Sequence, residues 1–251
     1  MKDRKKAEIE YYDKRVKNSG RDFERFKPQD LVGFKFLYDL LKKYVLGKQV
    51  LDYGCGNGIH TLAIAKMGAK KVVGIDLSER SLEIVKEKVK RGRLEDKIEF
   101  LKMDCEKMDF PNNYFDIIFD GGTFSSIDLN IAYPELARVL KPAGLLIGVE
   151  TFGHNPITNL KRKLNKLTGK RTSWAAEHIF KTRDLEEAKK HFSKIEVFYF
   201  HLISWLAFPF LRFKGANLLL KILEGLDKIL LKASFLRKYA FKVVFTFSQP
   251  K

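Results

Sequence analysis

The sequence predicts an α/β fold in which a doubly wound, mostly parallel sheet carries helices on both faces. Apolar runs alternate with helical patterns from about residue 47 to residue 150, which is typical of strands joined by crossover helices. A glycine-rich turn at 54–58 joins the first apolar run to the first of these helical patterns. The second apolar run, 71–75, ends in Asp76, so an acidic side chain stands at a strand tip.

Hydrophobic periodicity places the other elements of the first 150 residues. We expect helices over 3–17 and 29–45, joined by a loop that contains Gly20 and Pro28. Helical patterns follow over 59–67 and over 79–90, where Ser78 is a suitable N-cap. Pro134 is expected in the first turn of a helix that ends at Leu140.

The glycine-rich turn indicates a nucleoside-containing cofactor. Glycine tolerates positive φ angles and lets a ligand approach the backbone closely. Asp76 at the second strand tip can accept hydrogen bonds from a ribose diol. The spacing Gly54-x-Gly56-x-Gly58 differs from the G-x-G-x-x-G fingerprint of dinucleotide sites. Asp52, just before the turn, would repel a pyrophosphate but can face an amino or ammonium group.

The segment Leu51-Asp52-Tyr53-Gly54-Cys55-Gly56-Asn57-Gly58 resembles motif I of class I S-adenosylmethionine (SAM)-dependent methyltransferases. The resemblance continues over 74–78, 100–105, 115–120 and 136–144, with Ala143 where the family more often has Gly. It implies SAM as the cofactor and a seven-stranded sheet that ends in an antiparallel hairpin. In the family, the second-strand acid binds the ribose hydroxyls and a third-strand acid reaches the adenine amine. The residues that the resemblance assigns to the cofactor are Asp52, Gly54, Cys55, Gly56, Gly58, Asp76, Leu77, Asp104, Cys105 and Asp120.

Methyl transfer from a sulfonium requires an acceptor held in line with the methyl group. Where the acceptor is a hydroxyl or an acidic carbon, a general base removes its proton. His154 is the first candidate, because histidine titrates near neutrality and this one follows the fifth strand. Glu150 and His178 are the next candidates, and a hydrogen bond that structures a loop is the alternative role for each. Tyr11 and Tyr12 resemble aromatic residues that close over the cofactor in similar enzymes. No spaced Cys/His cluster indicates a metal site.

The positive charge is concentrated in the last third of the chain. The formal net charge is +17, and residues 151–251 contribute +13 of it, from 20 Lys and Arg against 7 Asp and Glu. This asymmetry favours an anionic partner such as a phosphorylated substrate, an acidic lipid surface or a nucleic acid. A solvated lysine-rich surface is the alternative. The first residues, 1–6, carry no apolar signal-peptide region, and two cysteines form no disulfide framework, so we expect a cytoplasmic protein.

The same third contains two insertions. We expect the last two strands over 194–200 and 241–247, with a long insert between them. A basic stripe around a helix at 160–167 could bind phosphate. In the long insert, 216–231 is an amphipathic helix, preceded by a segment, 197–211, without Asp, Glu, Lys or Arg. The insert is a lid whose apolar face covers the substrate site, a contact with an anionic membrane surface through 197–232, or both. The residues expected on the apolar face of the helix over 216–231 are Leu219, Ile222, Leu223, Leu226, Ile229 and Leu230.

The segment after the fourth strand, 120–124, reads Asp-Gly-Gly-Thr-Phe and lacks the Asn/Asp-Pro-Pro-Tyr/Phe pattern of amino-directed nucleic-acid methyltransferases. The resemblance therefore favours a small-molecule or lipid-linked acceptor, in the cytoplasm or peripherally at a membrane. RNA methylation is one alternative, and a non-catalytic SAM- or RNA-binding module is another. We divide the chain into N-terminal helices that cover the cofactor site (1–46), a SAM-binding core (47–150) and the rest of the sheet with substrate-covering insertions (151–251), within one structural domain.

Overall fold

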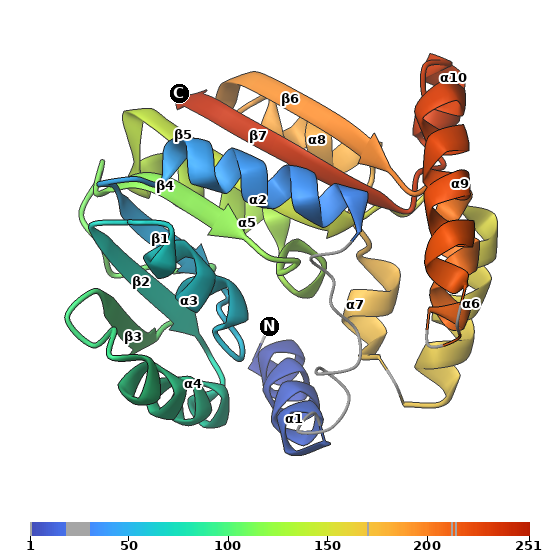
Figure 1. The fold of residues 1–251 in the computed structure, drawn as a ribbon. Helices are drawn as coiled ribbons and strands as arrows, with labels where there is room; N and C mark the ends of the chain where they lie inside the picture. The colour runs from blue at the N-terminus through green and yellow to red at the C-terminus, as the bar shows by residue number, and fades with distance from the viewer. Residues whose placement is uncertain (1, 19–30, 170, 212, 214) are drawn as a thin grey trace.

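A computed structural model describes residues 2–18, 31–169, 171–211, 213 and 215–251 of the chain. They form a seven-stranded sheet with the order β3-β2-β1-β4-β5-β7-β6 (Figure 1). Strand β7 runs antiparallel to both of its neighbours, and the other pairs are parallel. The predicted doubly wound, mostly parallel sheet and its final hairpin are confirmed. The strands are β1 (Gln49–Tyr53), β2 (Lys71–Asp76), β3 (Ile98–Lys102), β4 (Phe115–Asp120), β5 (Leu140–Thr151), β6 (Phe192–Phe200) and β7 (Lys242–Pro250).

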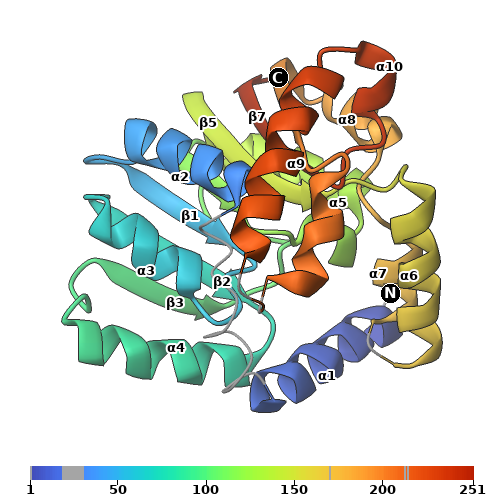
Figure 2. The same cartoon turned by 45° about the vertical axis from the view of Figure 1, so that its right-hand side comes forward.

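Helices cover both faces of the sheet (Figure 2). Helices α2 (Val32–Tyr44), α3 (Ile59–Lys66) and α4 (Glu79–Gly92) pack on one face, and α5 (Leu129–Val139) and α8 (Thr182–Ala188) pack on the other. Neighbouring residues of one strand point to opposite faces. Val50 therefore lies in the apolar core under α2, α3 and α4, and Leu51 lies in the core under α5 and α8. The continuous apolar strands of the sequence are thus buried on both sides.

The order of the strands decides where a ligand can bind. The connection after β1 runs through α3 on one face, and the connection after β4 runs through α5 on the other. Strands β1 and β4 are neighbours, so the two connections run to opposite faces from adjacent strand ends. This leaves a crevice at the carboxyl ends of β1 and β4. The glycine-rich turn that follows β1 therefore stands at the ligand-binding edge of the sheet.

Most of the expected helices are present, with one shift. Helices α1 (Lys2–Asn18) and α2 match the two leading helices, whereas the loop with Gly20 and Pro28 lies outside the described residues. Ser78 caps α4 as expected, because its Oγ accepts a hydrogen bond of 3.0 Å from the Ser81 backbone. The prediction for Pro134 is wrong. Helix α5 begins earlier, at Leu129, because Asp128 caps it, and Pro134 lies inside the helix.

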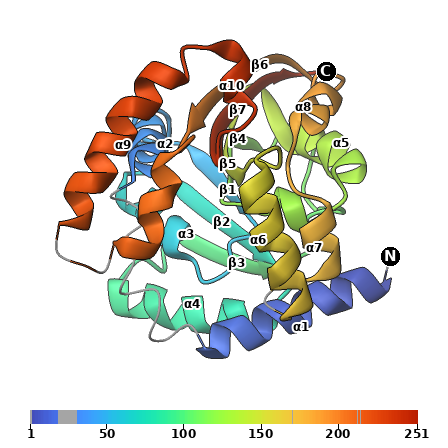
Figure 3. The same ribbon diagram turned by 90° about the vertical axis from the view of Figure 1, so that its right-hand side faces the viewer.

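The insertions of the last third lie at the carboxyl-end side of the sheet (Figure 3). Helices α6 (Pro156–Leu167) and α7 (Ser173–Glu177) follow β5, while η3 (Ser204–Phe210), α9 (Ala216–Leu230) and α10 (Ser234–Arg237) lie between β6 and β7. The expectation that the apolar face of α9 packs over the substrate site is wrong. Most of that face is exposed, and the side of α9 that contacts the protein carries Ala216, Leu220, Leu223, Glu224 and Asp227.

Candidate cofactor and active site

A cavity of about 330 Å³ lies at the carboxyl ends of β1 to β4. The loops that follow these four strands line it, and α1 covers it from the opposite side. The residues assigned to the cofactor by sequence that line the cavity are Asp52, Gly54, Cys55, Gly56, Asp76, Leu77, Asp104 and Cys105. Residues from five separate segments of the chain are thus brought to one place.

Two glycines of the turn occupy positions where a side chain does not fit. Gly58 has a φ of 70°, and a Cβ added there would lie 1.8 Å from Cγ2 of Val85 in α4. Gly54 has a φ of 71°, and its added Cβ would lie 2.2 Å from Oγ1 of Thr123. Both the left-handed backbone and the close neighbours require glycine. Gly58 therefore does not line the cavity; it lets the turn pack against α4.

Asp76 is held at the cavity wall by the backbone of the turn. Its Oδ2 accepts a hydrogen bond of 2.9 Å from the Gly56 N–H, and its Oδ1 accepts one of 2.8 Å from the Ser78 N–H. Burial raises the pKa of this carboxyl, while the two backbone donors act in the opposite direction. The carboxylate is thereby fixed next to the glycine-rich turn, where a ribose diol would be bound.

Asp52 lies deeper, at the end of β1. Its side chain is buried and accepts a hydrogen bond from the Thr61 hydroxyl on α3. Burial is the main cause that raises its pKa to about 7. Such a carboxyl gains from a cationic partner, because a positive charge offsets the desolvation of its ionised form.

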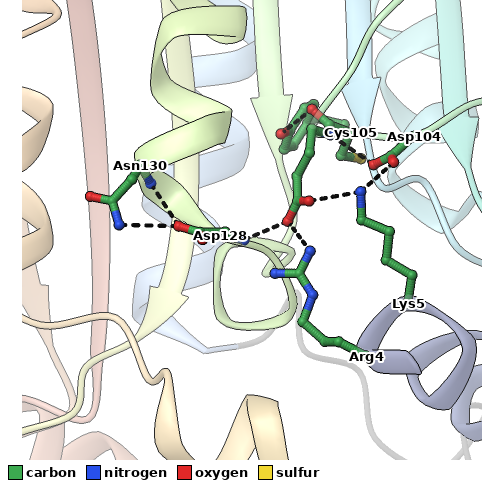
Figure 4. A network of polar contacts seen from close by, with 8 residues as sticks. Arg4, Lys5, Asp104, Cys105, Asp128 and Asn130 are labelled. Carbon is green, nitrogen blue, oxygen red and sulfur yellow. Dashed lines mark hydrogen bonds and ion pairs between the residues drawn. The ribbon is translucent and has the colours of Figure 1, made fainter. Parts of the chain in front are cut away.

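Asp104 faces a cation of the protein itself. The Lys5 ammonium on α1 lies 2.5 Å from Asp104 and 2.8 Å from Glu106, and Arg4 also pairs with Glu106 (Figure 4). Next to them, the Cys105 carbonyl accepts a hydrogen bond of 2.7 Å from the Tyr53 hydroxyl. The expected adenine site is thus the place where α1 is attached to the loop after β3.

Asp120 lies behind the cavity wall. Its Oδ1 accepts a hydrogen bond of 2.9 Å from the Thr123 N–H, so it shapes the loop 121–123 that lines the cavity. The side chain is fully buried, and burial together with the nearby Glu150 raises its pKa well above the usual value. The structure therefore assigns Asp120 contacts within the loop, and its expected contact with the cofactor stays a prediction.

The three candidate bases lie in three different surroundings. Glu150 is buried at the carboxyl end of β5, and burial raises its pKa to about 7 although Lys242 and Arg171 lower it. His154 Nε2 lies 3.1 Å from the Thr182 N–H, which donates to it at the start of α8. The His178 ring stacks on Trp174 with centroids 3.5 Å apart. Neither histidine lines the cavity.

Several cavity residues carried no signal in the sequence. Glu8 of α1 lines the cavity, is buried, and has one carboxylate oxygen without a hydrogen-bond partner. His60 of α3 also lines it, and its Nδ1 lies 2.9 Å from the Tyr38 hydroxyl. Of the two expected tyrosines, Tyr12 lines the cavity and Tyr11 packs edge-on against it. The ion pair between Lys5 and Asp104 shows why, because it joins residues about 100 positions apart in the sequence.

Among the described residues, no group of three or more His, Cys, Asp and Glu side chains is placed to hold a metal ion. No helix in the described ranges combines the length and the apolar character needed to cross a bilayer.

Comparison with known proteins agrees with this geometry. Residues 51–148 match a family described as a methyltransferase domain. A sterol 24-C-methyltransferase of Pneumocystis carinii is 35% identical over 105 residues, which are 41% of this chain and 28% of that protein. A demethylmenaquinone methyltransferase of Staphylococcus haemolyticus is 36% identical over 109 residues, which are 42% of this chain and 44% of that protein. The matches therefore span less than half of each relative.

The fold has solved counterparts. The geranyl diphosphate C-methyltransferase of Streptomyces coelicolor, solved with Mg²⁺, geranyl diphosphate and S-adenosyl-L-homocysteine, superposes with a TM-score of 0.60 at 15% identity, over 86% of this chain and 79% of that one. This likeness concerns the fold. The sequence match, the strand order and the acids at the cavity agree with one another, and residues 51–148 match a methyltransferase domain.

Proposed function

We propose that the protein transfers a methyl group from SAM to a small-molecule or lipid-linked acceptor. The observation that carries this proposal is the set of acidic side chains around the cavity at the ends of β1 to β3. The acceptor class is supported by the relatives, which are named for a sterol and for demethylmenaquinone. Geranyl diphosphate, found in the structural neighbour, is a further small lipid.

The residues around the cavity fit SAM in kind. Asp76 can accept hydrogen bonds from the ribose diol, and Asp52 can face the ammonium group. Asp104 can meet the adenine amine once Lys5 shares it. Bound SAM supplies the reactive methyl group. The chain's own contribution is to hold the acceptor in line and, through α1, to exclude water from the cavity.

For the acceptor's proton, we propose a carboxyl group. His154 Nε2 already accepts a hydrogen bond from the Thr182 N–H, so its lone pair is engaged. Glu150 and Glu8 flank the loop 125–126, since Glu150 accepts from the Ser125 backbone and Glu8 interacts with Ser126. Burial raises the pKa of both groups, to about 7 for Glu150, and a raised pKa favours proton uptake. Glu8 is the stronger candidate on geometry, because it lines the cavity.

For location, we propose a cytoplasmic protein that meets a membrane peripherally through part of 197–232. The exposed apolar residues of this segment support the contact. Arg212 and Lys214 of this segment lie outside the described residues.

The first test measures SAM binding by calorimetry for the natural chain and for Asp76→Ala. The loss of a partly buried, charged hydrogen-bond acceptor is expected to weaken binding by about 10- to 100-fold. Leu94→Ala, at a partly buried site outside the cavity, serves as the control. Equal affinity for SAM in the natural chain and in Asp76→Ala would contradict the cofactor site.

The second test incubates the protein with methyl-labelled SAM and separate lipid, small-molecule and RNA extracts. We expect label in the lipid or small-molecule fraction. Label in RNA alone would reject the proposed acceptor class. The absence of transfer to all three, with SAM still bound, would favour the non-catalytic alternative.

Once an acceptor is found, Glu8→Gln, Glu150→Gln, His154→Gln and His178→Gln separate the candidate bases. Loss of a general base is expected to lower kcat by about 10²- to 10⁴-fold and to remove the acidic limb of the pH profile. A histidine variant with that effect would restore the expectation drawn from the sequence.

A further inference from the structure

Exposed apolar side chains are concentrated in the C-terminal third. Among the described residues, 18 large hydrophobic side chains are exposed, and 14 of them lie between Ile157 and Phe235. Single exposed apolar residues are ordinary, but a concentrated set marks an interaction surface. The members on two helices are Ile157, Leu160, Leu164 and Leu167 on α6, and Leu218, Leu219, Ile222, Leu226, Ile229 and Leu230 on α9. We call these two sets together the α6–α9 surface.

Helix α6 turns its polar side inward. Thr158 and Arg162 are buried, and the Arg162 guanidinium donates a hydrogen bond of 2.7 Å to Asn159. The apolar residues recur every three or four positions on the opposite side, so they form one outward stripe. Leu167 at the end of the helix is 82% exposed. This is the reverse of the usual arrangement, in which the apolar stripe faces the core.

Helix α9 is attached to the protein through its two acids. Asp227 is buried and accepts hydrogen bonds from the Ile203 and Ser204 N–H groups, at 2.8 and 3.3 Å. Glu224 accepts a hydrogen bond of 3.0 Å from the Val32 N–H at the start of α2. These contacts fix the rotation of the helix, and the rotation leaves Ile222 and Leu226 exposed. The outward apolar stripe is therefore a consequence of specific internal contacts.

The charges that remain on the outside of these helices are all positive. Helix α6 contains no acidic residue, and both acids of α9 are used internally. Segment 204–241 contains no acids besides those two. The exposed charged residues on α6, α9 and the segment through α10 are Lys161, Lys163, Lys166, Lys221, Lys228, Lys232 and Arg237. Of these, Lys166 is paired with Glu177 of α7. Apolar side chains bordered by cations are complementary to a bilayer with anionic headgroups.

Both helices lie at the carboxyl-end side of the sheet, with η3 between them (Figure 3). Helix η3 adds Leu206 and Phe210 to the exposed apolar side chains, and Phe213 beyond its end adds another. The cofactor cavity opens at the ends of the same strands. The two helices therefore lie on the same side of the molecule as the cofactor cavity.

We propose that the α6–α9 surface docks the protein on a bilayer that contains anionic phospholipid, with the apolar stripes in the headgroup region and the lysines on lipid phosphates. The docking itself rests on exposure and charge. The delivery of a lipid-linked acceptor to the cavity rests in addition on the proposed function.

The test is co-sedimentation of the full chain with vesicles of phosphatidylglycerol and phosphatidylcholine, compared with pure phosphatidylcholine. We expect binding to the anionic vesicles at low salt and at least tenfold weaker binding to the neutral ones. Ile222→Asp with Leu226→Asp is expected to abolish binding, because the stripe then carries two anions. Lys221→Gln with Lys228→Gln is expected to weaken binding by about fivefold per lysine.

Two controls make the result specific. Asn217→Asp adds one negative charge at an exposed polar position of α9 and should weaken binding by no more than about fivefold. SAM affinity of the Ile222→Asp, Leu226→Asp variant should equal that of the natural chain. This control separates failure of docking from failure of the cofactor site.

Three results would overturn the proposal. One is an absence of binding of the natural chain to anionic vesicles at low salt. A second is vesicle binding that persists in the Ile222→Asp, Leu226→Asp variant, which would show a general attraction of charges. The third is a dimer in solution that this variant dissociates while no vesicle is bound, which would assign the surface to a second copy of the chain.

Discussion

The cofactor region and the C-terminal insertions distribute polar and apolar side chains in opposite ways. Around the cavity, acids such as Asp52 and Asp76 face inward over a sheet whose apolar residues fill two cores. On α6 and α9, polar groups such as Arg162 and Asp227 hold the helices, and apolar residues face outward. The first arrangement binds a small polar cofactor. The second leaves apolar side chains exposed on α6 and α9, which suits contact with a partner of low polarity.

The largest expected effect comes from a glycine-to-alanine substitution, which is made once in each of the two regions. Gly58→Ala places a Cβ at 1.8 Å from Val85 on a backbone with a φ of 70°, so we expect a loss of about 3 kcal/mol or more of unfolding free energy and of SAM binding. Gly225→Ala in α9 meets nothing within 4 Å and should stabilise the protein by about 0.5–1 kcal/mol. Urea unfolding checks both. A tolerated Gly58→Ala would mean that the turn packs differently.

A smaller effect is expected from the buried acid of α9. Asp227→Ala leaves the Ile203 and Ser204 N–H groups without their acceptor, which should cost about 1–3 kcal/mol in thermal or urea unfolding. Lys228→Ala, at the neighbouring exposed position, should change stability by less than about 0.5 kcal/mol. Equal effects of the two substitutions would show that α9 is not held by its acids.

The pH dependence of SAM affinity tests the buried acid of the cavity. The pKa of Asp52 is raised to about 7 by burial, so the group is mostly neutral below that pH and ionised above it. An ammonium group binds the ionised form, so affinity should fall by about tenfold per pH unit below pH 7. Asp52→Asn should bind more weakly at pH 8 and lose this slope. Calorimetry between pH 5.5 and 8.5 measures both, and an unchanged slope would reject the pairing.

The smallest expected effect is at the exposed stripe. Ile229→Ala should alter unfolding free energy by less than about 0.5 kcal/mol, because Ile229 is 64% exposed. Ile64→Ala in α3 removes a fully buried side chain and should cost about 2–5 kcal/mol. A similar cost at both positions would mean that the stripe of α9 is covered in solution.

The sequence predicted the parts of the site that depend on neighbours along the chain. The glycine turn, Asp52 and Asp76 all lie next to strands that the apolar pattern identifies, and the parallel order brings their ends together. Glu8 and Lys5 were not recognisable, because their contacts with 172 and 104 join residues that are far apart in sequence. A catalytic role of His154 stays a prediction, and only the fold shows that the Thr182 N–H donates to its Nε2.

Periodicity and turn chemistry determined the sheet, most of the helices and the identity of the cofactor region, because these are local properties of the chain. The amphipathic pattern of α9 was also visible in the sequence. What only the tertiary structure decided is which way such a helix faces. Two acids that bind backbone N–H groups of other segments turn its leucines outward. In α6, Asn159 and Arg162 donate hydrogen bonds to the Gly153 and Phe152 carbonyls that precede the helix. Amphipathicity fixes that a helix has two sides, whereas long-range hydrogen bonds select the side that meets the core.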